Sequence, residues 1–329
     1  MRTARVARIA GRLWFLGLLG LVPYVVPRLQ PLRFLVLFFL APLVVELVGR
    51  FRRPPRPREE APPVPERPLP GPAERGPLAF FLRFHASSLL ATLNPVQFAQ
   101  SVRQARGDAA AAERVVEDAA AFRQEVEYTL PFGGEWLVGG GGVTPGTSHS
   151  WELAAQRFAY DFLAVDAEGR SHAGDGTRLA DYLAYGRPVL APADGTVVAV
   201  NDGVRDAPGP GTGWLDWRAA DFRGNWVALR HAEREYSFLA HLVPGSVRVR
   251  PGDRVRRGDT LGLCGNSGHS SEPHLHFQVQ DHPDFFQAAG LPVAFSGCVV
   301  DAAPADGPVH LRVGMRVRPG SLVGSAGVP

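Results

Sequence analysis

The sequence of 329 residues contains no lysine, and all 35 of its basic residues are arginine. Together with abundant alanine, glycine and proline, this usage suggests a GC-rich coding bias. The arginines are scattered along the chain, so the formal net charge of +3 forms no basic segment of the kind that binds nucleic acid. We therefore expect no nucleic-acid partner.

Cysteine is scarce, because Cys264 and Cys298 are the only two. Two thiols cannot build a four-thiolate zinc site, so any metal must be held by histidine and carboxylate side chains. Their spacing is not that of metal ligands. We expect both thiols to be free and to pack as small hydrophobic groups.

The first 50 residues are predicted to be a membrane anchor. Two apolar runs, residues 13–26 and 34–49, are flanked by arginines. Each is shorter than the about 20 residues of a typical spanning helix, but flanking and snorkelling residues can extend both. Two short transmembrane helices are the first interpretation. A cleaved signal peptide is a less favoured alternative, because no small-residue cleavage site follows the first run. Two buried helices of a soluble fold are the other alternative.

Three further segments follow from composition. Residues 51–77 are a proline-rich, charged linker. Residues 78–126 have helix-forming composition, interrupted at Asn94–Pro95, and form a helical segment that lies on the membrane or against the following domain. The sequence indicates no function for this segment.

Residues 127–300 are predicted to form the main domain. Short valine-rich runs alternate with turn signals such as Asp194–Gly195, and a hairpin is expected around Glu233. The fold class is therefore mainly β, an antiparallel sandwich or open barrel, preceded by the membrane helices and the short helical segment. Residues 301–329 are a C-terminal extension.

Two features of this domain suggest a metal site. His274 and His276 flank one residue in a predicted strand, so both side chains point to the same face. This pair alone also fits two unrelated polar residues on a solvated face. Asp161 lies in the apolar stretch "RFAYDFLAV", where a carboxylate is costly unless it is paired or binds metal. Pairing with Arg157 is the alternative.

Residues 145–295 resemble the lysostaphin/LytM-type zinc metallopeptidases, which cleave peptide bonds of bacterial peptidoglycan. The segments that carry the resemblance are "APADGTVVAV", "GNWVALRH", "YSFLAHL", "VRVRPGDRVRRGDTLGLCGNSG" and "SSEPHLHFQV", in the family's order. The resemblance implies that Zn²⁺ is bound by His149, Asp161 and His276. It also implies catalytic roles for His241 and His274.

The first ligand pair departs from the spacing of many members. These have three residues between histidine and aspartate, whereas eleven residues separate His149 from Asp161 here. A longer-spaced subset with a similar strand fits better. His172 and His231 are the alternatives to His149.

The resemblance implies a membrane-anchored zinc metalloendopeptidase that hydrolyses peptidoglycan peptides with a zinc-activated water. Either His241 or His274 takes the proton of the water, and the sequence does not separate the two roles. The alternatives are a non-catalytic, metal-binding member that regulates other cell-wall hydrolases and a metal-dependent carbohydrate-binding module. A lipoyl or biotinyl carrier domain is excluded because it requires a lysine.

The predicted location contains a conflict. Arginines at both outer ends of the apolar pair favour a cytoplasmic domain, whereas peptidoglycan lies outside the membrane. Arg28 and Arg33 in the middle loop weaken the charge bias. On the ground of the substrate, we expect a cell-membrane protein with an extracytoplasmic catalytic domain. The bond that is cleaved and the oligomeric state are not encoded in any motif.

Overall fold

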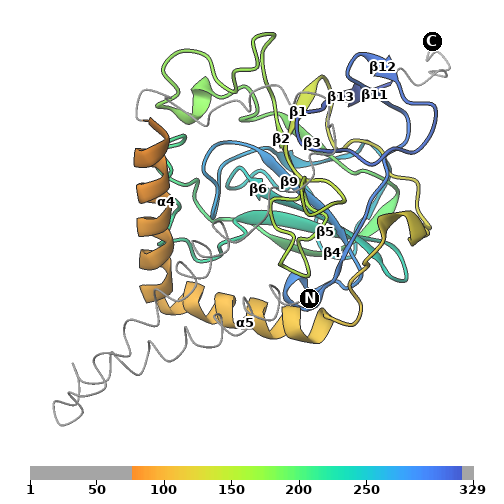
Figure 1. Cartoon of the computed structure of the whole chain (residues 1–329), viewed down its shortest axis with the longest axis horizontal. Coiled ribbons are helices and arrows are strands. Elements are labelled where there is room, and N and C mark those ends of the chain that lie inside the picture. Colours follow the sequence, from red (N-terminus) through yellow and green to blue (C-terminus); the bar gives the residue numbers. More distant parts are fainter. Residues whose placement is uncertain (1–75, 321–329) are drawn as a thin grey trace, which may run out of the picture. The chain divides into compact units, whose positions relative to one another are not determined.

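The computed structural model describes residues 76–320 (Figure 1). The predicted membrane anchor, residues 1–50, and the linker up to residue 75 lie outside the described residues. Within residues 76–320, no helix combines the length and the apolar character that a membrane crossing requires.

The domain is mainly antiparallel β-structure, as predicted. The main sheet has the strand order β12-β11-β13-β1-β2-β9-β6-β5-β4-β7, with β10 paired to β9, and β3 pairs with β8 in a second sheet. The strands are β1 Trp136–Gly140, β2 Tyr160–Leu163, β3 Pro188–Leu190, β4 Gly195–Asn201, β5 Asn225–Ala232, β6 Glu235–Leu242, β7 Arg254–Val255, β8 Thr260–Leu263, β9 Leu275–Gln280, β10 Gly290–Leu291, β11 Cys298–Val300, β12 Ala303–Pro304 and β13 Arg316–Pro319.

Strand β9 lies in the middle of the sheet, between β2 and β6. Its residues Leu275, Phe277 and Val279 alternate with polar residues and enter the main hydrophobic core. There they join aromatic residues such as Trp136 and Phe162. Because strand side chains alternate between faces, this apolar set fixes which side of β9 carries the polar residues.

The sheet continues past residue 300, where the sequence had suggested only an extension. Strand β13 lies between β11 and β1 and pairs with both. Its sequence, Arg316–Pro319, has one fully buried residue, Val317, beside two arginines. A four-residue strand with one core side chain gives too weak a periodic signal to be recognised from the sequence.

Two helices dock on this β-structure at its edge (Figure 1). Helix α4 spans Gly76–Leu93 and α5 spans Pro95–Ala111, with Asn94 capping the start of α5. In α5 the buried amide of Gln97 donates to the carbonyls of Asp216 and Ala219 at 2.9 and 3.0 Å. The helical segment is thus held against the loop that precedes β5. Three short 3-10 helices complete the described chain: η4 Ala119–Ala121, η5 Leu179–Asp181 and η6 Phe285–Gln287.

Both cysteines are free and buried, as predicted. Burial raises the pKa of the Cys264 thiol, so this thiol stays protonated and unreactive. We predict that the double variant Cys264→Ala/Cys298→Ala keeps the metal content and the activity of the wild type in reducing and oxidising buffers alike. Each lost sulfur leaves a small cavity that costs about 1 kcal/mol of stability. Metal analysis and thermal unfolding check this, and loss of activity in a stably folded double variant would contradict it.

Candidate metal centre

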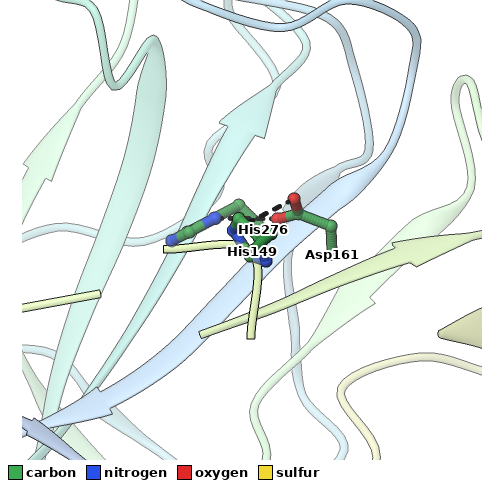
Figure 2. Close-up of side chains that lie close together, drawn as sticks. All are labelled: His149, Asp161 and His276. Atoms are coloured by element: carbon green, nitrogen blue, oxygen red, sulfur yellow. Dashed lines mark hydrogen bonds and ion pairs between the residues drawn. The ribbon is translucent and has the colours of Figure 1, made fainter. Parts of the chain in front are cut away.

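The site begins with the pairing of β2 and β9. In this register Asp161 lies directly opposite His276, and Ala240 of β6 flanks His276 on the other side. Cross-strand partners point to the same face, so the carboxylate and the imidazole meet above the sheet. Figure 2 shows these two side chains with His149, which comes from the loop between β1 and β2.

Three potential ligand groups converge at this point. The Oδ1 atom of Asp161 lies 2.9 Å from Nδ1 of His276, and its Oδ2 atom lies 3.4 Å from Nε2 of His149. One ligand atom from each of the three residues lies within 4.8 Å of the others. Gly140 makes room for this arrangement, because a Cβ atom there would lie 3.0 Å from Nδ1 of His149.

This donor set suits a tetrahedral zinc ion. With zinc bonds of roughly 2.0–2.1 Å, the ligand atoms of a tetrahedral ion are about 3.3 Å apart. The separations of 2.9 and 3.4 Å, which involve different oxygens of Asp161, lie near that value. Side-chain exposure is 31% for His149, 26% for Asp161 and 8% for His276. His276 is therefore buried in the sheet, whereas His149 and Asp161 are partly exposed to solvent. A water or substrate can approach the cluster from their side.

Two further histidines stand beside the cluster. The ring centroid of His241 lies 4.8 Å from that of His274 and 5.8 Å from that of His276. The Nδ1 atom of His241 lies 2.8 Å from the carbonyl of Ser267, and Nδ1 of His274 lies 2.8 Å from the carbonyl of Glu272. A carbonyl only accepts, so each Nδ1 carries a hydrogen, and Nε2 is the ring atom left to face the site. Nε2 of His274 lies 3.6 Å from Oδ1 of Asp161.

His241 also has an unusual backbone. Its φ of +65° places it in the left-handed region, which non-glycine residues seldom adopt. It lies near the end of β6, where the hydroxyl of Ser267 donates to the carbonyl of Leu242, the last residue of the strand, at 2.7 Å. The hydrogen bonds of its Nδ1 to the carbonyl of Ser267 and of its own carbonyl to the N–H of Gly265 hold this residue in place.

Burial and charge shape the titration of the cluster. Burial raises the pKa of Asp161, but the neighbouring imidazoles of His149, His274 and His276 outweigh it and hold that pKa well below its usual range. Burial lowers the pKa of His241 well below its usual range, and the nearby His274 and His276 lower it further. Asp161 is therefore an anion and His241 a neutral imidazole near pH 7, the forms that metal binding and proton acceptance need.

A buried carboxyl group supports His274 from below. Glu272 accepts a hydrogen bond of 2.6 Å from the hydroxyl of Ser171, and burial raises its pKa to about 7. The backbone carbonyl of Glu272 accepts from Nδ1 of His274, and its side chain accepts from Ser171. Glu272 therefore links the residues just before β9 to the loop that contains Ser171.

The alternatives for the ligand pair lie elsewhere. His231 bonds to the carbonyl of Asp194 and to Ser237, and the metal-capable group among the described residues includes neither His231 nor His172. Arg157 stacks over the ring of Trp151, and the ion pairs of Asp161 in the described part are all with histidines.

Sequence reasoning missed the residues that orient the histidines. Gln278 and Gln280 continue the polar face of β9 beyond His276 and are fully buried. The strict alternation of polar and apolar residues in "HLHFQVQ" carries this signal. The carbonyl of Ser267 has no such signal, because a backbone acceptor is independent of the side chain.

Fold and site together define a class: an antiparallel β-domain with a cluster of two histidines and an aspartate, and two more histidines beside it. Residues 175–288 match the model of peptidase family M23. The chain therefore carries a domain of peptidase family M23. The matched span includes His241, His274 and His276 and begins after His149 and Asp161.

Curated relatives cover part of the chain. Peptidoglycan DD-endopeptidase ShyA of Vibrio cholerae is 31% identical over 116 residues, which are 35% of this chain and 23% of ShyA. Glycyl-glycine endopeptidase ALE-1 of Staphylococcus capitis is 30% identical over 144 residues, 40% of this chain and 34% of ALE-1. The chain thus spans about a quarter to a third of these relatives. A structure of lysostaphin from Staphylococcus simulans matches 51% of this chain and 52% of its own, with 19% identity and a TM-score of 0.30.

The raised pKa of Glu272 predicts a pH dependence of stability. Because folding favours the protonated form, this stabilisation is complete below about pH 4.5 and is lost as the pH rises through about 7. The shift corresponds to a loss of about 3 kcal/mol. We predict that Glu272→Gln removes this component when urea unfolding is followed from pH 4.5 to 8 with chelator present. The exposed Glu113→Gln is the control, and wild-type and Glu272→Gln curves that stay parallel would contradict the prediction.

Proposed function

We propose that this chain is a membrane-anchored zinc metalloendopeptidase that hydrolyses peptide bonds of peptidoglycan. The observation that carries the proposal is the convergence of His149, Asp161 and His276 within 4.8 Å, beside His241 and His274. The names of ShyA and ALE-1 support a peptide of the cell wall as substrate.

The side chains that would hold zinc are His149, Asp161 and His276, because one ligand atom of each lies within 4.8 Å of the other two. When bound, zinc supplies a Lewis acid and a water whose pKa is lowered toward about 7. Asp161 contributes the single negative charge of the ligand set. The solvent-open side at His149 and Asp161 leaves space for the scissile peptide.

His241 and His274 supply the proton chemistry. Each has its Nδ1–H bound to a carbonyl, so each presents the Nε2 atom as a proton acceptor. One imidazole takes the proton of the attacking water and passes it to the leaving amine. The other, once protonated, donates a hydrogen bond to the oxyanion. Each role contributes about 10²–10⁴-fold to the rate.

The N-terminal sequence supports a location at the cell membrane, with the catalytic domain extracytoplasmic. Two arginine-flanked apolar runs precede the domain, and a peptidoglycan substrate requires access from outside. We predict that a reporter fused after Pro77 is digested by protease added to intact cells. A cytoplasmic control must stay protected, and protection of the reporter itself would overturn this location.

Alanine variants separate ligands from catalysts. We predict that the full-length wild type binds one zinc ion, that Asp161→Ala or His276→Ala loses both zinc and activity, and that His241→Ala or His274→Ala keeps zinc. The last two should slow hydrolysis by about 10²–10⁴-fold, the range for a lost acid–base or oxyanion group. Metal content and the release of amines from cell-wall peptides are measured side by side.

Three outcomes would count against this assignment. Full zinc content in Asp161→Ala would show that the ligand set is wrong. Zinc lost by His274→Ala but kept by His276→Ala would exchange their roles. A wild type that binds zinc but releases no amines would favour the alternative, a non-catalytic member that regulates other cell-wall hydrolases. Chelator should stop the active enzyme, and added zinc should restore it.

A further inference from the structure

The polar face of β9 continues beyond the metal cluster into the interior. Gln278 and Gln280 follow His276 at every second position, and the exposed fraction of each is 0%. Their cross-strand neighbours on β6 are Phe238 and Tyr236. Two neutral amides in such a setting are costly unless every donor and acceptor that lacks water finds a partner.

The two amides form a single chain of hydrogen bonds that begins at the metal cluster. Nε2 of His276 lies 3.1 Å from Oε1 of Gln278. The amide of Gln278 donates to Oε1 of Gln280 at 2.6 Å. The amide of Gln280 donates to the backbone carbonyl of His282 at 2.7 Å.

The last acceptor fixes the direction of the whole chain. The carbonyl of His282 can only accept, so Gln280 must turn its NH₂ group toward it. Oε1 of Gln280 then faces Gln278, which must donate its own NH₂ group in turn. Oε1 of Gln278 is left to face His276, and it requires a hydrogen on Nε2. The reversed direction would set two oxygen acceptors against each other at His282.

We propose that Gln278 and Gln280 are positioning residues that hold His276 as its Nε2–H tautomer, so that the Nδ1 lone pair is presented to the metal. The inference rests on the proposed function, in which His276 is a zinc ligand. Nδ1 lies 2.9 Å from Oδ1 of Asp161, to which it donates a hydrogen bond while no metal is bound, whereas Nε2 points away into the amide chain. Zinc would take the place of the hydrogen on Nδ1, and Nε2 would keep its own. A ring held as the opposite tautomer would carry a hydrogen on the atom that must bind zinc.

The chain of hydrogen bonds through Gln278 and Gln280, called the relay below, affects the affinity of the site for metal. Acceptors behind a ligating histidine fix its tautomer and raise its basicity, and their loss commonly weakens metal binding about 10–100-fold. In the low dielectric around Phe238, a chain of aligned amides is polarised cooperatively, which strengthens the acceptor at Gln278. Gln280 matters only through Gln278, so its loss should have the smaller effect.

The test measures the zinc dissociation constant of the full-length protein in detergent, by competition with a chromophoric chelator, together with thermal unfolding. We expect Gln278→Met to weaken zinc binding about 10–100-fold. Gln278→Glu retains an acceptor toward His276 and should keep the wild-type zinc affinity, even if the buried charge lowers the unfolding temperature. Gln280→Met should show an intermediate loss, and it replaces Gln278→Met as the deciding variant if the latter does not fold.

The matched control is Gln97→Met. Gln97 is also a buried, fully bonded glutamine, but it lies in α5 and bonds to Asp216, Ala219 and His269. Its replacement should lower the unfolding temperature and leave zinc affinity unchanged.

The failures of the two ideas are distinguishable. If His276→Ala binds zinc like the wild type, His276 is no ligand, and the proposed function and the relay both fall. If His276→Ala loses zinc while Gln278→Met and Gln280→Met bind it like the wild type, only the relay is overturned. Equal losses in Gln278→Glu and Gln278→Met would also overturn it, because the acceptor would then be irrelevant.

Discussion

The register between β2 and β9 is the constraint on which the site depends. It sets Asp161 opposite His276 and, by the same alternation, sends Leu275, Phe277 and Val279 into the core. A slip by one residue would turn the histidines into the apolar core and turn Leu275, Phe277 and Val279 toward the polar cluster. The energy that forbids the slip comes from the hydrophobic core, so the precision of the polar cluster is a consequence of apolar packing on the other side of the same strand.

Within this register, His241, His274 and His276 are each oriented by an acceptor, and His276 turns the opposite ring nitrogen to the site from the one that His241 and His274 turn. His241 and His274 give Nδ1–H to backbone carbonyls and keep Nε2 for the reaction. His276 has Nε2 engaged by Gln278 and turns Nδ1 to Asp161. The acceptor's position therefore decides which nitrogen of each ring can bind a metal or a proton.

The sequence predicted the mainly β fold from local signals, whereas His149 came into the candidate site only through the resemblance to a known family. Period-2 alternation and turn residues mark the strands, and a carboxylate in an apolar strand is conspicuous at Asp161. The ligand assignments themselves stay predictions until metal is measured. Strand β13, the docking of α5 through Gln97 and the carbonyl of Ser267 could not be predicted, since each depends on contacts between segments far apart in the chain. Backbone acceptors also have no residue type by which to recognise them.

The division of β9 into an apolar face that packs in the core and a polar face that forms the site explains why the site tolerates unfavourable local features. His241 adopts a left-handed backbone, and two amides are buried behind His276, each of which opposes folding unless its surroundings compensate. The compensation comes from the aromatic core and from completed hydrogen bonds, not from the cluster itself. A substitution that loosens that core would therefore disturb the metal site without touching a ligand. A substitution in the relay would alter the chemistry of His276 while the apolar face of β9 stayed in place, so stability and metal affinity are two separable properties of one strand.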